Sequence, residues 1–381
     1  MVVGAGHCGL AASYHLTQRG IDHVVLERGE VAEAWRSERW DSLRLLTPNW
    51  QVTLPGRTYS GPDPDGFMST AEVVELMTAY AATEDVPVRT GISVESVTSA
   101  EGGYRVQTTS GDWLCRCVVA ATGATSQPSV PAFATEVPDD VTSVTSMEYK
   151  SPEQLPEGGV LVVGASATGL QLADEIHRSG RPVILSVGEH VRMPRTYRGK
   201  DILWWMTHSG RLEERYDEID DLSRARNLPS PQLIGTPDRS TLDLNALVEN
   251  GVVLAGRLAG IRDGKAQFSG SLKNVCALAD LKLNRLLNLF DEWAGDGGID
   301  GEVGESERFA ATEVPDKPML GLDFGDANVR SIVWATGYRP DFGWLDLPVF
   351  DRKGRLRHDG GIVETAPGVY TLGADELAGL T

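Results

Sequence analysis

Two glycine-rich turns of the same design start at Gly4 and, 160 residues later, at Gly164. They read Gly4-Ala5-Gly6-His7-Cys8-Gly9 and Gly164-Ala165-Ser166-Ala167-Thr168-Gly169. Glycine at such positions lets the backbone turn tightly, approach a pyrophosphate, and pack a helix closely against a strand. The helix after each turn would direct its unpaired N–H groups at the phosphates, and Ser166, which replaces the middle glycine, adds a hydroxyl. These residues favour the binding of two dinucleotides.

The first turn belongs to a complete unit of strand, turn, helix and strand that ends in an acid. Val2-Val3 leads into the turn, residues 10–19 have helical character, and Val24-Val25-Leu26 forms the next strand. Glu27 follows, 23 residues after Gly4, where a carboxylate can accept hydrogen bonds from ribose hydroxyls. We therefore predict a dinucleotide site that includes Glu27; the alternative is an ordinary βαβ turn. Since three residues precede Gly4, either the first strand is short or the start is truncated.

The second unit lacks an acid at the corresponding place. Ser186 and Val187 stand 22 and 23 residues after Gly164, and neither offers a carboxylate to a ribose diol. Arginines follow, among them Arg192 and Arg195. A missing acid with guanidinium groups nearby is typical of a site for a ribose 2′-phosphate, as in NADP. The alternative is that these arginines are ordinary surface charges.

Each unit also ends in a strand that runs into Ala-Thr-Gly, at Thr122-Gly123 and at Thr336-Gly337. Small residues and a permissive glycine are expected where backbone passes close to a ligand, and their repetition makes the pattern informative. A stretch rich in Trp and Leu begins at Trp35-Arg36. Its aromatic rings can wall a flat ring system, although simple packing beneath a loop explains them as well.

Composition limits the classes of protein and partner. A chain of 381 residues can form two domains, and 41% hydrophobic with 23% charged residues is ordinary for a soluble globular protein. The net charge of −19 disfavours nucleic-acid and anionic-membrane partners, because phosphate binding relies on Lys and Arg. The sequence has no membrane-length apolar run and no secretory signal, so we expect a cytoplasmic protein. The four cysteines form neither a CxxC pair nor a zinc spacing, and no metal site is expected.

Together, the two glycine turns, the two Ala-Thr-Gly strand ends and the stretch from Trp35 to Pro48 resemble the two-dinucleotide-binding-domain flavoproteins. Within that group the chain is most similar to class B flavin-dependent monooxygenases and related NAD(P)/FAD-dependent oxidoreductases, over nearly its whole length. The resemblance implies FAD and NADP as cofactors. The implied FAD-binding residues are Gly4, Gly6, Gly9, Glu27, Arg28, Trp35, Arg36, Thr122 and Gly123. The implied NADP-binding residues are Gly164, Ser166, Thr168, Gly169, Arg192, Arg195, Thr336 and Gly337.

The order of elements and the resemblance predict an α/β protein with two Rossmann-like dinucleotide-binding domains. The FAD domain is expected to be discontinuous, with an N-terminal part at residues 1–150 and a return segment at residues 326–381. The NADP domain, residues 151–325, would be inserted into it. Apolar residues recur at helical spacing from Leu272 to Trp293, which predicts a helical insertion between two strands.

The resemblance also implies an activity, that of an NADPH-using monooxygenase. Such an enzyme forms a C4a-peroxyflavin with molecular oxygen and oxygenates a small organic substrate, such as an amine, a sulfide or a ketone. Because the flavin carries out the chemistry, we nominate no catalytic side chain. The chain differs from the family signature near Tyr149, where Thr145 takes the place of a histidine, which bears on oxygen chemistry rather than on cofactor binding. Alternatives are an NADPH-dependent reductase or oxidase without a redox disulfide, and a flavin-binding protein that is not an enzyme.

Overall fold

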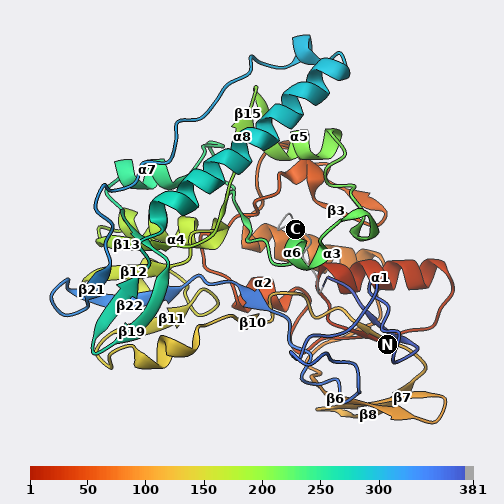
Figure 1. Cartoon of the computed structure of the whole chain (residues 1–381). Helices are drawn as coiled ribbons and strands as arrows, with labels where there is room; N and C mark the ends of the chain where they lie inside the picture. Colours follow the sequence, from red (N-terminus) through yellow and green to blue (C-terminus); the bar gives the residue numbers. More distant parts are fainter. Residues whose placement is uncertain (374–381) are drawn as a thin grey trace.

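The computed structural model describes residues 1–373, which form two lobes, each built on a five-stranded parallel sheet (Figure 1). The first sheet has the order β24-β9-β1-β2-β5, with β1 (Val2–Val3), β2 (Val25–Leu26), β5 (Val88–Arg89), β9 (Val118–Ala120) and β24 (Val369–Thr371). The second has the order β11-β22-β12-β13-β18, with β11 (Thr142–Thr145), β12 (Gly159–Val163), β13 (Val183–Val187), β18 (Val253–Gly256) and β22 (Val329–Trp334). The predicted α/β fold with two Rossmann-like units is confirmed.

Strand pairing corrects the predicted domain boundaries. The sequence analysis assigns residues 142–145 to the first domain and residues 329–334 to the return segment. In the structure, β11 pairs in parallel with β22, and β22 pairs with β12, so both strands belong to the second sheet. The chain therefore leaves the first sheet after β9 and starts back only after β22. Loop composition does not reveal this, because the strands that pair are remote in sequence.

The two connections between the lobes lie side by side. One follows β9 and contains β10 (Gln127–Pro128), and the other follows β22 and contains β23 (Tyr338–Arg339). These short strands pair antiparallel, and Figure 1 shows β10 between the lobes. The Gln127 amide donates to the Asp341 carboxylate at 2.9 Å, which links the connections a second time. The lobes are thus joined at the carboxyl ends of β9 and β22.

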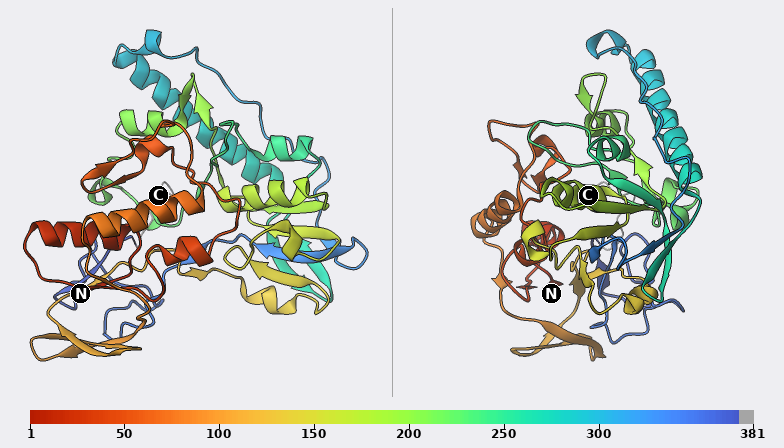
Figure 2. Two further views of the ribbon diagram at one scale, coloured as in Figure 1. Left: turned by 180° about the vertical axis from the view of Figure 1, so that it is seen from behind. Right: turned by 90° about the vertical axis from the view of Figure 1, so that its left-hand side faces the viewer.

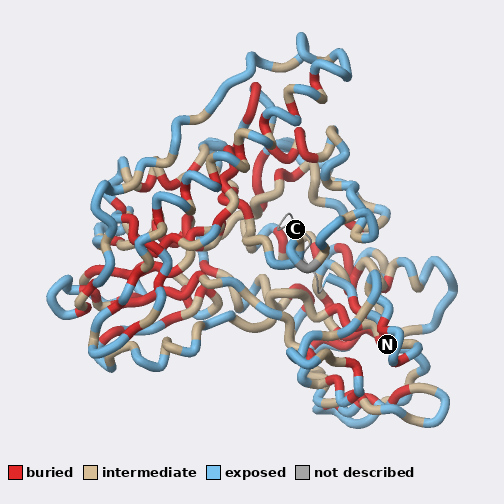
Figure 3. The backbone as a smooth tube through the Cα atoms, viewed as in Figure 1, coloured by how far each residue is buried: buried red, intermediate tan, exposed pale blue. Residues whose placement is uncertain are grey.

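Both faces of the first sheet are covered. Helices α1 (His7–Gln18) and α3 (Thr70–Thr83) pack on one face, and the antiparallel strands β6 (Val94–Ala100), β7 (Gly103–Thr108) and β8 (Gly111–Cys115) cover the other. Leu10 and Met77 fill the helical side, and Val97 and Val106 fill the strand side. Figure 3 shows buried backbone running through the sheets of both lobes.

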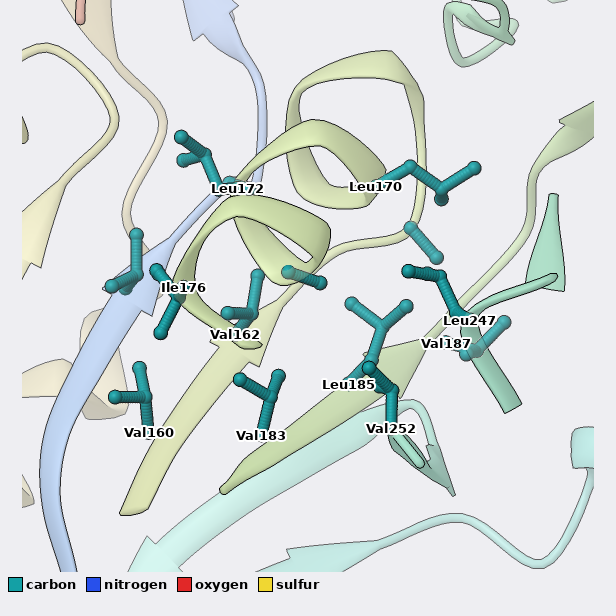
Figure 4. Packing of buried hydrophobic residues seen from close by; sticks show 14 of the residues in the cluster. Val160, Val162, Leu170, Leu172, Ile176, Val183, Leu185, Val187, Leu247 and Val252 are labelled. Atoms are coloured by element: carbon teal, nitrogen blue, oxygen red, sulfur yellow. The ribbon is translucent and has the colours of Figure 1, made fainter. Parts of the chain in front are cut away.

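The second sheet is covered in the same way. Helices α4 (Ala167–Arg178) and α7 (Leu244–Glu249) pack on one face, with Leu170, Leu172 and Ile176 of α4 lying over the strands (Figure 4). Strands β19 (Leu258–Arg262), β20 (Lys265–Phe268) and β21 (Gly321–Asp323) cover the other face. All five residues of β12 are buried, as expected for a central strand between two layers.

The predicted helical insertion is confirmed as α8 (Leu272–Asp296), which lies between β20 and β21 in the chain and runs along the outside of the second lobe (Figure 2). Leu287 and Phe290 pack against Trp205 of α5 (Ile202–His208), and the Trp205 and Phe290 ring centroids are 5.6 Å apart. The remaining helices and strands are short: α2 (Glu33–Ser37), β3 (Thr53–Leu54), β4 (Arg57–Thr58), β14 (Val191–Arg192), β15 (Thr196–Tyr197), β16 (Lys200–Asp201), α6 (Leu222–Ala225) and β17 (Pro231–Gln232).

Candidate functional site

The first glycine turn combines two crowded positions with one open position. A Cβ atom added at Gly4, whose φ is +106°, would lie 2.5 Å from the Ala121 carbonyl oxygen. A Cβ added at Gly9 would lie 1.9 Å from the Gly4 carbonyl oxygen. At Gly6 an added Cβ would meet nothing within 4 Å. Gly4 and Gly9 are therefore required by the fold, whereas Gly6 leaves open space in which a phosphate could approach the backbone.

Glu27 is held at the end of β2, directly beside this turn. Its side chain is buried, with Oε2 accepting from the Ala5 N–H at 2.8 Å and Oε1 accepting from the Gly29 N–H at 3.1 Å. Each carboxylate oxygen has a second lone pair, so ribose hydroxyls could still donate to it. The predicted partner of a ribose thus has a fixed position at the site.

Thr122 lies next to the turn and has an unused polar group. Its Oγ1 atom is buried and has no hydrogen-bond partner among the described residues. The Thr122 Cα atom lies 3.4 Å from the Cβ position of Gly4, and Gly123 has a φ of +77°. A buried hydroxyl without a partner is uncommon, and a polar ligand group at the turn would satisfy it.

Helix α2 is attached to the turn by Ala32, the residue that precedes it. The Ala32 N–H, in the left-handed conformation with φ 63°, donates to the Ala5 carbonyl at 3.2 Å. This contact places Trp35 near the first turn, where its half-buried ring lies 5.4 Å from the guanidinium carbon of Arg39. Trp35 therefore belongs to the segment attached to the first turn, and its predicted contact with FAD stays a prediction.

Arg28 and Arg36 are occupied by protein groups. Arg28 pairs with the Glu38 carboxylate. Arg36 donates to the Val31 carbonyl and to the Thr78 hydroxyl, each at 3.1 Å. Both side chains hold the segment around α2 in place, and their predicted contact with FAD stays a prediction.

The second glycine turn repeats the crowding of the first. A Cβ at Gly164, φ +109°, would lie 2.2 Å from the Ala335 carbonyl oxygen, and one at Gly169 would lie 1.8 Å from the Gly164 carbonyl oxygen. Ser166 occupies the place of the open glycine and is the residue before α4. The two turns thus have the same backbone design, and the serine replaces glycine only where an added side chain has room.

A cavity of about 1620 Å³ lies over the carboxyl ends of the second sheet. It brings together five of the residues predicted for NADP: Gly164, Ser166, Thr168, Thr336 and Gly337. The connection between the lobes contributes Thr125 and Gln127, and the first lobe contributes Phe350, Asp351 and residues 353–358. Single sites for small molecules usually measure ~300–1,000 Å³, so this cavity has room for a nucleotide and a second molecule.

Arg192 and Arg195 lie elsewhere, which argues against their predicted contact with a 2′-phosphate. The Arg192 side chain is 5% exposed and pairs with Asp243 at 2.7 Å and with Asp280 at 2.6 Å. The Arg195 side chain is 1% exposed and pairs with Asp201 at 2.6 Å. Neither arginine lines the cavity. Because their guanidinium groups are buried and neutralised by carboxylates, we correct the prediction and assign them to the stability of the second lobe.

A different arginine, Arg257, lines the cavity at the end of β18. Its side chain is exposed, and its Cγ atom lies 3.8 Å from the position that a Cβ atom added at Gly188 would take. Within residues 1–373 the side chain has no hydrogen-bond or ion-pair partner. The sequence analysis missed Arg257 because it follows the strand beyond the second glycine unit. β18 pairs directly with β13, and that pairing is the signal that would have identified it.

The thiols give no sign of a redox centre. All four cysteines are free. Burial raises the pKa of the Cys8 and Cys115 thiols, and it raises the pKa of Cys276 to about 11. A thiolate nucleophile requires the opposite shift, so Cys8, Cys115 and Cys276 are not activated. Among residues 1–373 no group of three or more His, Cys, Asp or Glu side chains could hold a metal ion, and no helix could cross a bilayer.

The fold and the paired turns define a two-dinucleotide-domain oxidoreductase. Residues 1–216 match the family described as pyridine nucleotide-disulphide oxidoreductase, and because this is more than half of the chain, the protein belongs to that family. An uncharacterized CzcO-like oxidoreductase of Geobacillus kaustophilus is 28% identical over 376 residues, which cover 98% of this chain and 90% of the relative. The rice indole-3-pyruvate monooxygenase YUCCA1 is 36% identical over 184 residues, covering 47% of this chain and 45% of the relative.

Solved structures share the fold. A flavin-containing monooxygenase from Stenotrophomonas maltophilia aligns with a TM-score of 0.64 and 19% identity, covering 98% of this chain and 88% of that one. A bacillithiol disulfide reductase from Staphylococcus aureus aligns with a TM-score of 0.60 and 14% identity, covering 100% and 91%. The predicted class, a flavin monooxygenase-like oxidoreductase, is therefore confirmed, and the two sites agree with FAD and NADP as its cofactors.

The contrast between Gly6 and Gly9 gives a matched pair of variants. Gly9→Ala should destabilise the flavin-free protein by about 1–3 kcal/mol or more, because the new methyl group overlaps the Gly4 carbonyl. Gly6→Ala should change stability by less than ~0.5 kcal/mol and weaken FAD binding instead, because its methyl group enters the open space. Denaturant unfolding and fluorescence titration with FAD measure the two effects. Equal effects of both variants on stability would contradict this assignment.

Glu27 is expected to bind the ribose of FAD. Glu27→Ala should weaken FAD binding by roughly 1–3 kcal/mol, since a charged hydrogen-bond partner is lost. Glu27→Gln, which keeps one acceptor oxygen, should weaken it less. Flavin content after purification and a titration of the flavin-free protein give the values. Unchanged affinity in Glu27→Ala would remove Glu27 from the site.

Arg192 is expected to contribute to folding rather than to cofactor choice. Arg192→Ala leaves two carboxylates without their partner and should cost about 3–5 kcal/mol of unfolding free energy. Arg262→Ala, at an exposed arginine at the end of β19, is the control and should cost less than ~0.5 kcal/mol. Urea unfolding followed by circular dichroism tests both. A stable Arg192→Ala protein that loses only NADPH affinity would restore the sequence-based prediction.

Proposed function

We propose that the protein is an FAD-dependent monooxygenase that uses NADPH and molecular oxygen to oxygenate a small organic substrate. The observation that carries the proposal is the duplicated glycine turn on two parallel sheets joined at their carboxyl ends. Bound FAD would supply the hydride and oxygen chemistry. The four free cysteines agree with the reducing environment of the cytoplasm, which we propose as its location.

The first lobe holds the groups that would bind FAD. Gly6 leaves space for the pyrophosphate at the N-terminus of α1, and the Glu27 carboxylate stands where ribose hydroxyls would donate. The unpaired Thr122 hydroxyl and the Trp35 ring offer further contacts. These residues bind and orient the cofactor, and none of them needs to transfer a proton.

The second lobe holds the groups that would bind the nicotinamide nucleotide. The N-terminus of α4 and the Ser166 hydroxyl face the cavity, where a pyrophosphate would accept from them. Val187 takes the register position that Glu27 takes in the first lobe, because Ser186 pairs with Val163 as Leu26 pairs with Val3. A ribose diol would therefore find no acid at this strand end.

Arg257 supports a preference for NADPH over NADH. Its side chain passes beside Gly188, directly after the strand end that carries Val187, and its guanidinium has no ion-pair partner among residues 1–373. The Ser186 hydroxyl cannot donate to a phosphate, since it donates to the Gly256 carbonyl oxygen at 3.1 Å and accepts from the Leu258 N–H at 2.9 Å. A guanidinium can pair bidentately with a 2′-phosphate.

The state of the thiols favours a monooxygenase over a disulfide reductase. A reductase of a disulfide substrate would use a thiolate, and burial raises the pKa of Cys8, the cysteine inside the first glycine turn. An oxidase remains the second candidate. The two are separated by products: a monooxygenase consumes one O₂ per NADPH and yields oxygenated substrate, whereas an oxidase yields hydrogen peroxide in equal amount. Full recovery of hydrogen peroxide with every substrate tried would overturn the proposal.

We expect flavin reduction by NADPH to be at least tenfold more efficient than by NADH, which corresponds to about 1.4 kcal/mol or more. Arg257→Ala should remove most of that preference by raising KM for NADPH, with little change for NADH. Arg262→Ala is the matched control and should keep the wild-type ratio. Anaerobic stopped-flow measurement of flavin absorbance gives both constants. A wild-type preference for NADH would instead indicate that Glu189 binds the ribose. Glu189 lines the same cavity, and its Oε1 atom accepts from Lys282 Nζ at 3.2 Å.

A further inference from the structure

The large cavity has a charge opposite to that of the chain. The whole sequence has 35 basic and 54 acidic residues, yet the cavity is lined by six arginines or lysines and three carboxylates. The cations are Arg226, Arg257, Arg339, Lys353, Arg355 and Arg357. A cavity lined by an excess of one sign attracts ligands of the other sign. The cavity is therefore suited to anions.

These cations lie in two separate places. Arg257 follows β18 at one edge of the second sheet, and Arg339 follows β22 on the other side of the glycine turn. Three strand spacings separate β18 from β22, which is roughly 14 Å at about 4.8 Å each. The phosphates of a nucleotide on the turn at Gly164 would reach Arg257. Arg339, an exposed residue of β23, lies beyond β22 on the opposite side.

Two of the three carboxylates in the lining, Asp341 and Asp351, are already engaged by protein groups. Asp341 accepts from the Gln127 amide and from the Gly343 N–H, each at 2.9 Å. Asp351 pairs with Arg355 at 2.9 Å. In contrast, the side chains of Arg339 and Lys353 have no hydrogen-bond or ion-pair partner in the described part of the chain. Two exposed cations without such a partner thus line the cavity in addition to Arg257.

Apolar side chains accompany these two cations. Phe342 is buried, and Phe350 and Leu356 are half-buried, and all three line the same cavity. The backbones of Phe350 and Leu356 pair in an isolated antiparallel β-bridge, in the segment that carries Lys353. A ligand with an apolar body and an anionic group would satisfy both kinds of contact.

We propose that the second occupant of the cavity is an organic carboxylate with an apolar body, whose carboxylate pairs with Arg339 and Lys353. The proposal rests on the proposed monooxygenase function and gives its substrate class. An arginine can hold a carboxylate through two parallel hydrogen bonds, and Lys353 adds a mobile second charge. The aromatic side of the cavity then receives the part of the substrate that is oxygenated.

Two sulfides that differ by one carboxylate group test this substrate class: 4-(methylthio)benzoate and methyl phenyl sulfide. For each, sulfide, O₂, NADPH and H⁺ give sulfoxide, NADP⁺ and H₂O, so the sulfur gains one oxygen atom and NADPH supplies two electrons. We expect kcat/KM to be at least tenfold higher for the carboxylate. In the double variant Arg339→Gln, Lys353→Gln that ratio should fall at least fivefold, mainly through KM for the carboxylate. Arg352→Gln, at an exposed arginine of the same segment outside the cavity lining, should keep the wild-type ratio.

Calorimetric binding of 4-(methylthio)benzoate to the protein saturated with FAD and NADP⁺ separates this proposal from the proposed activity. Binding that the double variant loses, without oxygenation of either sulfide, supports the anion site and overturns the monooxygenase. Equal kcat/KM for the two sulfides, or a preference for the neutral one, overturns the anion site. An increase in KM for NADPH in the double variant, with an unchanged sulfide ratio, also overturns it, because the two cations would then serve the nucleotide.

Discussion

The structure depends on one close contact, made twice: the first helix of each unit touches the glycine turn with no room for a side chain. A Cβ at Gly9 or Gly169 would lie within 2 Å of the carbonyl oxygen of Gly4 or Gly164. This contact holds the helix N-terminus at the carboxyl edge of the sheet, where its free N–H groups can meet a phosphate. The same crowding leaves Gly6 and Ser166 as the open positions. Fold and cofactor site therefore follow from one packing constraint.

Features set by local sequence could be predicted. The turn at Gly4, the acid at Glu27 and the helix from Leu272 all depend on residues within about one supersecondary unit. Glu27 reaches the Ala5 N–H because β1 and β2 are adjacent parallel strands, which the strand and helix pattern already implies. The repetition of the unit at Gly164 predicted the second sheet for the same reason.

Features set by remote partners could not be predicted. Arg192 looked like a phosphate ligand from its place after β13, but it pairs with Asp280 of α8, 88 residues away, and its burial depends on how α8 docks. The sequence does not show which of several arginines is neutralised in this way. Arg257 was missed for the related reason that only the pairing of β18 with β13 brings it to the cavity. The boundary near residue 142 was misplaced because β11 pairs with β22.

The charge of the chain as a whole says little about its ligand. Salt screens the interaction between exposed charges that are more than about 8–10 Å apart. The acidic surface therefore repels a polyanion that lies against it, such as nucleic acid, more than it repels a small anion inside the cavity. Within the cavity, the nearest side chains without an ion-pair partner determine which ligand charge is favoured. Among the described residues these include three cations, Arg257, Arg339 and Lys353. Within residues 1–373 their guanidinium and ammonium groups have no ion-pair partner, whereas Asp341 and Asp351 are bound to protein groups. An acidic protein can therefore contain a site for anions, and only the arrangement of ion pairs in the structure reveals it.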